Sequence, residues 1–220
     1  MIYAKKVLRD RRIPFDIVAP NTYDEDDLVG LLAYAKSKLP EYVRLQRIQR
    51  DIPAKLIVSG SIHGHIRQMA QERLEKEGGR CHCIRCREIG RRPSNAVEKD
   101  ETLTYSCCGG TEHFLSTTAG DALIGFVRLR FPGRVFRSEL ENAALVRELH
   151  VYGMMVPLGE KGAGDERQHR SYGKHLLSRA EEMAKEAGFE KVAIMAGIGV
   201  RPYYHRQGYV RRGPYMVKEL

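Results

Sequence analysis

The sequence predicts a mixed α/β domain over residues 100–220, preceded by a small, basic and mostly helical region. Two patterns support this interpretation. Short β-prone runs dominate the C-terminal part, where one long amphipathic helical pattern interrupts them. Two shorter helical patterns and a connector rich in Cys, Arg and Gly come before it. Strands on both sides of a long helix are typical of a layered α/β fold.

The composition fits a folded protein that binds a polyanion. Of the 220 residues, 42% are hydrophobic and 30% are charged, and the net charge is +9. Residues 36–92 hold 14 basic and 6 acidic residues, a net of 14 − 6 = +8. A basic stretch of this kind suits nucleic acid, and a solvated basic face is the alternative that the charge alone leaves open. No run approaches the ~20 apolar residues that span a bilayer, and the N-terminus lacks a signal-like apolar run. We therefore expect a cytoplasmic protein without a membrane partner.

Two helices are predicted in the N-terminal region. The first begins at a cap formed by Asn21 or Thr22, carries acidic residues in its first turn, and ends before Pro40. The second covers residues 65–77 and is closed by two glycines. Residues 43–48 are interpreted as a strand. The inner face of the first helix is expected to hold Leu28, Leu31, Leu32 and Ala35.

The C-terminal region is predicted to form a sheet and one long helix. The helix covers residues 171–187, with apolar residues at helical spacing on its inner face, and ends at Gly188. Six strands are expected, at residues 103–107, 113–116, 122–131, 144–152, 191–196 and 209–218.

Three cysteines at C-x-C-x-x-C spacing, Cys81, Cys83 and Cys86, form a candidate metal site. In a reducing compartment a disulfide is not expected, and closely spaced thiolates suit a soft tetrahedral ion, most simply zinc. The alternative is a set of unligated or redox-active cysteines. A closed site needs a fourth ligand, for which the sequence offers Cys107, Cys108, His82 and His113.

A glycine-rich loop leads into the long helix, and the residues from Gln168 to Gly173 open that helix. Free N–H groups and a partial positive charge at a helix N-terminus can hold a pyrophosphate. The string resembles the Gln/Arg-x-x-Gly-x-Gly/Ala pattern of GCN5-related acetyltransferases, in which that turn holds coenzyme A. Ser171 stands where the pattern prefers its first glycine.

Longer strings resemble one family. Residues 144–153 (ALVRELHVYG), 197–209 (GIGVRPYYHRQGY) and 213–218 are similar to the acetyltransferase domain of the catalytic subunit of Elongator. Residues 42–57 and 81–88 are similar to the linker of the same family. The resemblance covers roughly residues 22–220.

The resemblance implies a GCN5-related N-acetyltransferase fold and a tRNA-modifying acyltransferase. That family uses acetyl-CoA to begin carboxymethylation at carbon 5 of the wobble uridine, and joins a radical S-adenosylmethionine domain to the acetyltransferase domain. Residues 1–80 then correspond to a remnant of the radical domain and a basic linker, 81–99 to the connector with its zinc knuckle, and 100–220 to the acetyltransferase domain. The chain has no cysteine motif for an iron–sulfur cluster, so radical chemistry is expected from a separate domain or subunit.

The resemblance also implies roles for individual residues. Tyr203 and Tyr204 are expected to be catalytic by facing the thioester, with Tyr204 also contacting the cofactor. The strand at residues 148–151 is expected to part from its neighbour and pair with the pantetheine arm as an added strand would. The expected cofactor-binding residues are Glu148, Leu149, His150, Val151, Gln168, Tyr172, Gly173, Lys174 and His175, and the expected tRNA-binding residues are Arg44, Arg47, Arg50, Lys55, Arg85 and Arg87.

Two alternative functions stay open at this point. One is a protein or small-amine N-acetyltransferase, in which Glu148 acts as a general base through a water; a solvated or ion-paired Glu148 is the competing interpretation. The other is a noncatalytic tRNA-binding fragment that keeps the cofactor pocket as structure. Fold alone does not separate these functions.

Overall fold

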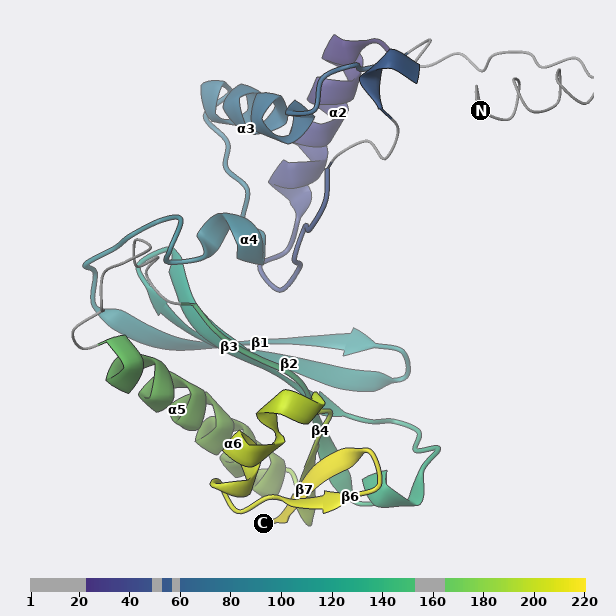
Figure 1. The fold of residues 1–220 in the computed structure, drawn as a ribbon, viewed down its shortest axis with the longest axis vertical. Helices are drawn as coiled ribbons and strands as arrows, with labels where there is room; N and C mark the ends of the chain where they lie inside the picture. Colours follow the sequence, from purple (N-terminus) through teal and green to yellow (C-terminus); the bar gives the residue numbers. More distant parts are fainter. Residues whose placement is uncertain (1–22, 49–52, 57–59, 153–164) are drawn as a thin grey trace, which may run out of the picture. The chain divides into compact units, whose positions relative to one another are not determined.

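A computed structural model describes residues 23–48, 53–56, 60–152 and 165–220, and the side chains of Leu56 and of residues 165–171 lie outside that description. The chain divides into two compact units, Met1–Cys86 and Arg87–Leu220 (Figure 1). The cysteine segment therefore belongs with the N-terminal unit. Within the described residues no helix is long and apolar enough to cross a membrane.

Two packed helices are the main elements in the described part of the N-terminal unit. Helix α2 (Glu25–Lys38) packs on α3 (Ile66–Lys76), and the short helices η1 (Ala54–Leu56) and α4 (Ile84–Arg87) follow α2 and α3 in sequence. Val29, Ile66 and Ala70 share one small apolar cluster. The end of α3 is closed by Gly78, whose φ of +75° only glycine adopts without strain.

The structure corrects three predictions for this unit. Asp24 caps α2, accepting a hydrogen bond from the amide of Asp27 at 2.8 Å, so the expected cap at residues 21–22 is wrong. The buried face of α2 carries Val29, Ala33 and Lys36, one position along from the predicted face. Residues 43–48 form no strand, because the amide of Ile84 bonds the carbonyl of Val43 and holds this segment against α4.

A seven-stranded sheet with the order β1-β2-β3-β4-β5-β7-β6 forms the second unit. All neighbouring strands are antiparallel except β4 and β5. The strands are β1 (Glu98–Cys107), β2 (Gly110–Ala119), β3 (Ala122–Phe131), β4 (Ala143–Val151), β5 (Lys191–Ile194), β6 (Val210–Arg212) and β7 (Tyr215–Glu219). The fold class predicted from the sequence is confirmed.

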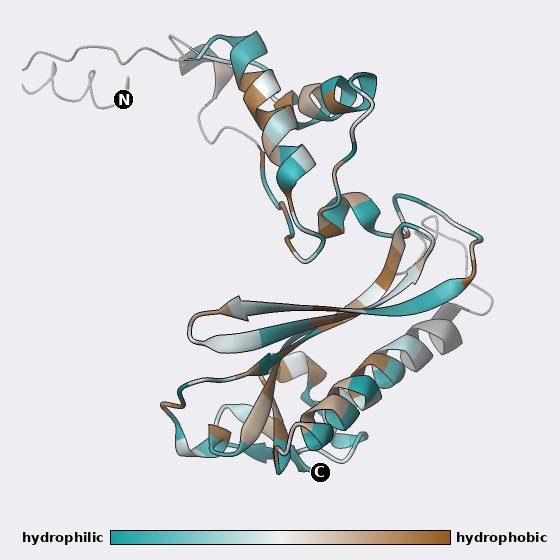
Figure 2. Cartoon of the chain, turned by 180° about the vertical axis from the view of Figure 1, so that it is seen from behind, coloured by the Kyte–Doolittle hydropathy of each residue, from teal (hydrophilic) through white to brown (hydrophobic). Residues whose placement is uncertain are grey.

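Helix α5 (Asp165–Glu186) lies along one face of this sheet (Figure 1). Its buried residues Leu176, Leu177, Ala180 and Ala184 pack with apolar residues of β2–β5 and β7 in the main core. Brown and teal residues both appear along α5 in Figure 2, as expected for a helix with one buried face. Removing one of these side chains, as in Leu176→Ala, is expected to cost roughly 2–5 kcal/mol.

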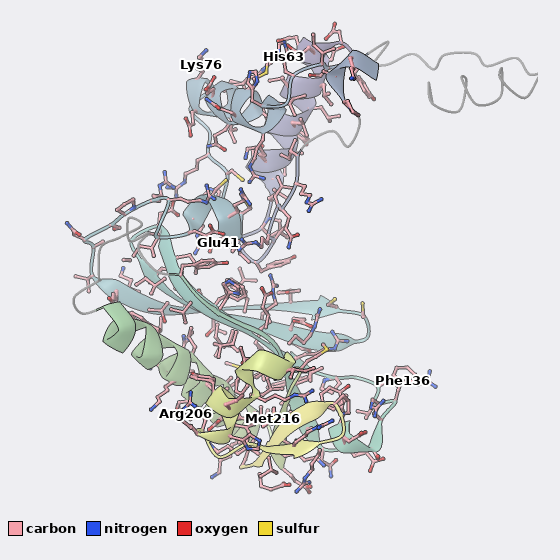
Figure 3. All side chains as sticks on the ribbon, in the orientation of Figure 1. Glu41, His63, Lys76, Phe136, Arg206 and Met216 are labelled. Atoms are coloured by element: carbon pink, nitrogen blue, oxygen red, sulfur yellow. The ribbon has the colours of Figure 1, made fainter. Side chains whose placement is uncertain are left out.

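The predicted elements differ from the structure mainly at their ends. The expected last strand is two strands, β6 and β7, because Gly213 at φ +57° turns the chain between them. Helix α5 begins at Asp165, six residues before the predicted start. Between β3 and β4 the chain forms the short helix η2 (Ser138–Leu140), and Phe136 just before it is 81% exposed (Figure 3).

Candidate acetyl-CoA site and metal centre

Strands β4 and β5 part halfway along β4. Their pairing runs from Ala143 opposite Lys191 to Val146 opposite Ile194. Beyond Val146, β4 continues to Val151 with β3 as its partner. Arg147 is an extra residue in the β3–β4 ladder, since Val146 faces Leu129 and Glu148 already faces Arg128. A bulge re-aims the strand that carries it, so the predicted parting at residues 148–151 is confirmed.

Within the described residues, the parting leaves backbone groups of β4 without a strand partner on the β5 side. The amide of Tyr152 bonds the carbonyl of Ile124 on β3. Backbone groups alternate between the two edges of a strand, so the groups of Leu149 and Val151 face the opposite edge, where β5 has ended. This edge offers hydrogen bonds to an extended ligand, as the pairing with a pantetheine arm requires.

Tyr203 lies at this parting. It belongs to helix α6 (Arg201–His205), which follows β5 and the short helix η3 (Ile198–Val200). The Tyr203 hydroxyl is buried and has no hydrogen-bond partner among the described residues. Burial raises the pKa of this phenol, so it stays protonated and can donate a hydrogen bond. An unpartnered buried hydroxyl is costly and is expected where a ligand supplies the missing partner.

Gly173 brings α5 against the same hydroxyl. A Cβ atom at Gly173 would lie 2.9 Å from the Tyr203 Oη and 3.9 Å from Cγ2 of Val151. Three elements, β4, α5 and α6, therefore converge on one small space. Glycine inside a helix costs about 1 kcal/mol relative to alanine, so its presence here is explained by the close approach.

Substituting Gly173→Ala tests this convergence. We expect the folded state to be as stable as wild type or more stable, because helix propensity favours alanine by about 1 kcal/mol. We expect acetyl-CoA to bind at least about tenfold more weakly, because the added methyl group displaces the Tyr203 ring. Thermal denaturation and isothermal titration measure the two effects. Gly188→Ala, at φ +86° with open space around it, is the matched control and should lose stability without losing acetyl-CoA affinity.

Tyr204 has a different environment from Tyr203. It is 7% exposed and belongs to the main core, with its ring edge-on to that of Tyr203 at 5.1 Å. Burial raises the pKa of Tyr204 to about 12. Both tyrosines stay predicted site residues, but of these two only Tyr203 has a buried hydroxyl without a partner among the described residues.

Glu148 forms an ion pair. The Arg128 Nε donates to its Oε2 at 2.9 Å, and the Arg128 guanidinium also lies over the rings of Phe114 and Phe126. The carboxylate oxygen that a general base would offer to a water already accepts from this guanidinium. The ion-paired interpretation of Glu148 is therefore favoured over the general base.

Glu148→Gln separates these two roles. For an ion pair, we expect turnover of acetyl-CoA to stay within about threefold of wild type and stability to fall by about 1 kcal/mol or less. A general base would instead lose about 10²-fold or more in turnover. Initial rates of coenzyme A release, measured beside a denaturant titration of both proteins, distinguish the outcomes.

The predicted phosphate-binding residues do not all face the parting. Tyr172 donates a hydrogen bond to Glu98, and the His175 Nε2 lies 2.6 Å from Oδ2 of Asp100, so both side chains face β1. Because α5 begins at Asp165, residues 172–175 follow its first turn instead of forming it. Lys174 is exposed. Gln168 has a backbone within α5, and its side chain lies outside the described ones. Coenzyme A contacts by these residues stay predictions.

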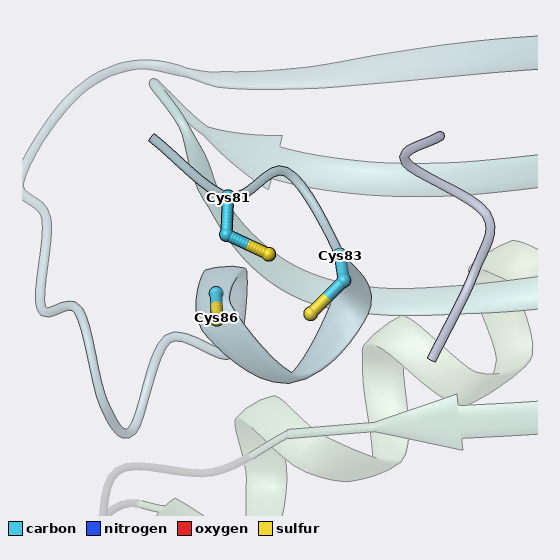
Figure 4. A group of neighbouring side chains, drawn as sticks. All are labelled: Cys81, Cys83 and Cys86. Atoms are coloured by element: carbon cyan, nitrogen blue, oxygen red, sulfur yellow. The ribbon is translucent and has the colours of Figure 1, made fainter. Parts of the chain in front are cut away.

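Three thiols gather in the N-terminal unit. The Sγ atoms of Cys81, Cys83 and Cys86 all lie within 4.8 Å of one another, and the first two residues are buried. Figure 4 shows the side chains converging on the turn that opens α4. Thiol hydrogen bonds from Cys81 and Cys86 lower the pKa of Cys83, and the amide of Leu45 also points at its sulfur. This cluster favours a thiolate, the form that binds metal.

A buried lysine faces the cluster. Lys36 of α2 is 1% exposed, and its Nζ lies 3.8 Å from the Cys86 Sγ. Among the described side chains, no carboxylate forms an ion pair with Lys36. A buried ammonium needs a nearby negative charge. One divalent ion bound by three thiolates would have a net charge of −1, and the ammonium of Lys36 would balance that charge. These residues therefore fit a metal such as zinc.

The structure leaves the fourth ligand position open. Among the described residues, no other His, Cys, Asp or Glu joins the three thiols. His82 pairs with Arg80 through its Nε2 at 3.4 Å. Cys107, Cys108 and His113 belong to the second compact unit. None of the four residues that the sequence offered is therefore supported as a ligand.

The predicted tRNA-binding residues differ in how exposed they are. Arg47 and Lys55 are exposed, and Arg44 and Arg85 are partly exposed, so these four stay candidates; Arg50 lies outside the described residues. Arg87 is only 2% exposed, and its Nε donates to the carbonyl of Asp121 at 3.3 Å. Phosphate contact by Arg87 is therefore not supported, because its guanidinium bonds the fold itself.

Two residues of the candidate sites escaped the sequence-based reasoning. In the sequence, Lys36 looks like a lysine that faces solvent. It follows Val29 by seven residues and Ala33 by three, and this helical spacing places it on the same buried face of α2. Arg147 gives no sequence sign of a bulge. Its Nη1 donates to the buried carboxylate of Glu112 at 2.5 Å, and Arg130 donates to the same oxygen at 3.2 Å.

Comparisons with known proteins agree with this geometry. Residues 84–209, more than half of the chain, match the Acetyltransferase (GNAT) family, and the chain therefore belongs to that family. Residues 20–76 match the Radical_SAM C-terminal domain.

Full-length relatives define the similarity further. The chain is 43% identical over 209 residues to a tRNA uridine(34) acetyltransferase of Methanocaldococcus jannaschii, covering 90% of this chain and 39% of that protein. It is 40% identical over 213 residues to the Elongator complex protein 3 of Homo sapiens, and the match covers 90% of this chain and 38% of that protein. It is also similar to the structure of the archaeal Methanocaldococcus infernus Elp3 with an N-terminal deletion, with a TM-score of 0.84, 39% identity, and coverage of 98% of this chain and 52% of that one. The resemblance to the catalytic subunit of Elongator is confirmed, and the chain spans about two fifths of the length of the curated relatives.

Proposed function

We propose that this chain is the acetyl-CoA-using part of a tRNA-modifying enzyme that acts at carbon 5 of the wobble uridine. The observation that carries the acetyl-CoA part is the open edge of β4 beside the unpartnered Tyr203 hydroxyl. The tRNA part rests on the named relatives and on the basic N-terminal region. A separate radical S-adenosylmethionine domain or subunit would supply the carbon-centred chemistry, in line with the match at residues 20–76.

The residues at the parting have distinct tasks in this proposal. Acetyl-CoA supplies an activated acetyl group as a thioester. The backbone groups of Leu149 and Val151 bind and orient its pantetheine arm as an added strand. The Tyr203 hydroxyl donates a hydrogen bond to the thioester, either to its carbonyl oxygen or to the sulfur that leaves. Gly173 keeps α5 close enough to exclude water from the Tyr203 hydroxyl.

We also propose that Cys81, Cys83 and Cys86 hold a structural zinc ion with Lys36 as its counter-charge. The mutual distances of the thiols and the burial of Lys36 support this. The ion would tie the turn before α4 to α2 and to residues 43–48, where the exposed Arg47 lies. The reducing conditions that keep these thiols free suit the cytoplasm, which we propose as the location.

Release of free coenzyme A from acetyl-CoA, with and without tRNA, tests the proposed function. We expect release that rises at least about tenfold when tRNA is added and that falls as salt is raised, because phosphate contacts weaken with salt. Release that is independent of tRNA but rises with a small amine would favour an amine N-acetyltransferase. tRNA binding without any acetyl-CoA binding would leave a noncatalytic fragment.

A further inference from the structure

Two adjacent cysteines at the tip of the β1–β2 hairpin lie outside the acetyl-CoA site and the metal centre. Cys107 ends β1, Cys108 and Gly109 form the turn, and β2 begins at Gly110. Both thiols are free, with Cys107 partly exposed and Cys108 exposed. The Cys107 thiol donates to the Cys108 sulfur at a separation of 3.6 Å.

This contact depends on the backbone of the turn. Successive side chains of a regular strand point to opposite faces, which would hold neighbouring thiols apart. Cys108 instead has φ +47°, and Gly109 has φ +70°, as in a two-residue turn that favours Asn, Asp or Gly at its first position. A cysteine there costs about 1 kcal/mol of backbone strain and turns its side chain toward Cys107.

Two arginines, both also bonded to Glu112, lie near the pair. The Arg130 Nη2 donates to the carbonyl of Cys108 at 3.0 Å. The pKa of Arg147 is raised chiefly by its hydrogen bond to Glu112, and the nearby Cys107 contributes. Accessible thiols that touch one another have the properties of a site of reversible oxidation.

We propose that Cys107 and Cys108 form a reversible thiol–disulfide pair that reacts with hydroperoxides. In the first step one thiolate attacks a peroxide oxygen, so that an S–O bond forms, the O–O bond breaks, and water leaves after taking up a proton. In the second step the other thiol attacks this sulfenic sulfur; the S–S bond forms, the S–O bond breaks, and a second water leaves. Two thiols and one hydrogen peroxide thus give one disulfide and two waters, and a dithiol reductant reverses the change.

Peptide mapping of the whole chain tests this inference without using activity. Trypsin should release residues 100–128, which contain Cys107 and Cys108 and no other cysteine. After brief treatment with hydrogen peroxide and alkylation, we expect this peptide without alkyl groups and two hydrogen masses lighter than its reduced form. Reduction with dithiothreitol before alkylation should restore two alkylation sites.

The variant Cys108→Asn is the matched control, because asparagine suits the turn and carries no thiol. It should keep wild-type stability or gain slightly, and should lose the internal disulfide while Cys107 becomes sulfenic acid or a mixed disulfide. Full alkylation of both cysteines in peroxide-treated wild type would overturn the inference, and so would disulfides that join this peptide only to other peptides. Neither result bears on acetyl-CoA turnover, so failure here is distinct from failure of the proposed function.

Discussion

Tyr203→Phe is expected to lower acetyl-CoA turnover by roughly 10²-fold while leaving the protein at least as stable as wild type. The two effects have one cause. The hydroxyl is buried without a partner in the described part of the chain, so removing it relieves a desolvated polar group, whereas turnover loses the donor that we propose for the thioester. Coenzyme A release and thermal denaturation, measured on the same preparation, give both quantities.

Two controls sharpen this prediction. Tyr204→Phe, a change to a ring in the main core, should affect turnover much less than Tyr203→Phe. Burial raises the pKa of Tyr203, so the neutral donor persists and turnover should show no loss from its ionisation below about pH 10. A variant Tyr203→Phe with normal turnover would exclude the hydroxyl from the reaction.

Removal of the proposed zinc ion is expected to have the largest effect on stability. Structural zinc sites contribute about 10 kcal/mol or more to folding in small domains. We therefore expect metal analysis of protein purified with a reductant to give about one zinc per chain. Chelation, or the substitution Cys83→Ser, should destabilise the N-terminal unit by several kcal/mol, seen as a separate and earlier thermal transition.

Lys36→Met tests the same centre through its charge. With a metal bound, loss of the ammonium leaves an excess negative charge, and zinc affinity should fall by about 10- to 100-fold. Without a metal, the same change replaces a buried charge by an apolar side chain and should stabilise the protein. Lys38→Met, at an exposed position of the same helix, is the control. Increased stability of Lys36→Met together with unchanged metal content would contradict the zinc centre.

The sequence predicted the sheet and the long helix well because their signals are local. β3 agrees with its predicted range at both ends, 122 and 131, and α3 agrees within one residue at each end. Strand alternation and helical spacing act over a few residues and are visible without the fold. Gly213, which splits the expected last strand, is a local signal that sequence reasoning passed over.

The site was predicted less completely because its geometry depends on contacts between distant segments. The parting of β4 from β5 comes from the bulge at Arg147, whose partner Glu112 lies 35 positions away. The role of Gly173 depends on Tyr203, and the role of Lys36 depends on Cys86. Arg87 shows the reverse error, since an arginine in a basic string is usually exposed and this one is buried.

Residue-resolved amide hydrogen exchange along β4, with and without acetyl-CoA, tests the central claim most directly. The amides of Leu149 and Val151 face the open edge, whereas that of Tyr152 already bonds Ile124 on β3. Acetyl-CoA is expected to slow exchange at Leu149 and Val151 at least about tenfold and to change Tyr152 little. Acetyl-CoA that binds without protecting Leu149 and Val151 would show that the open edge of β4 is not its site.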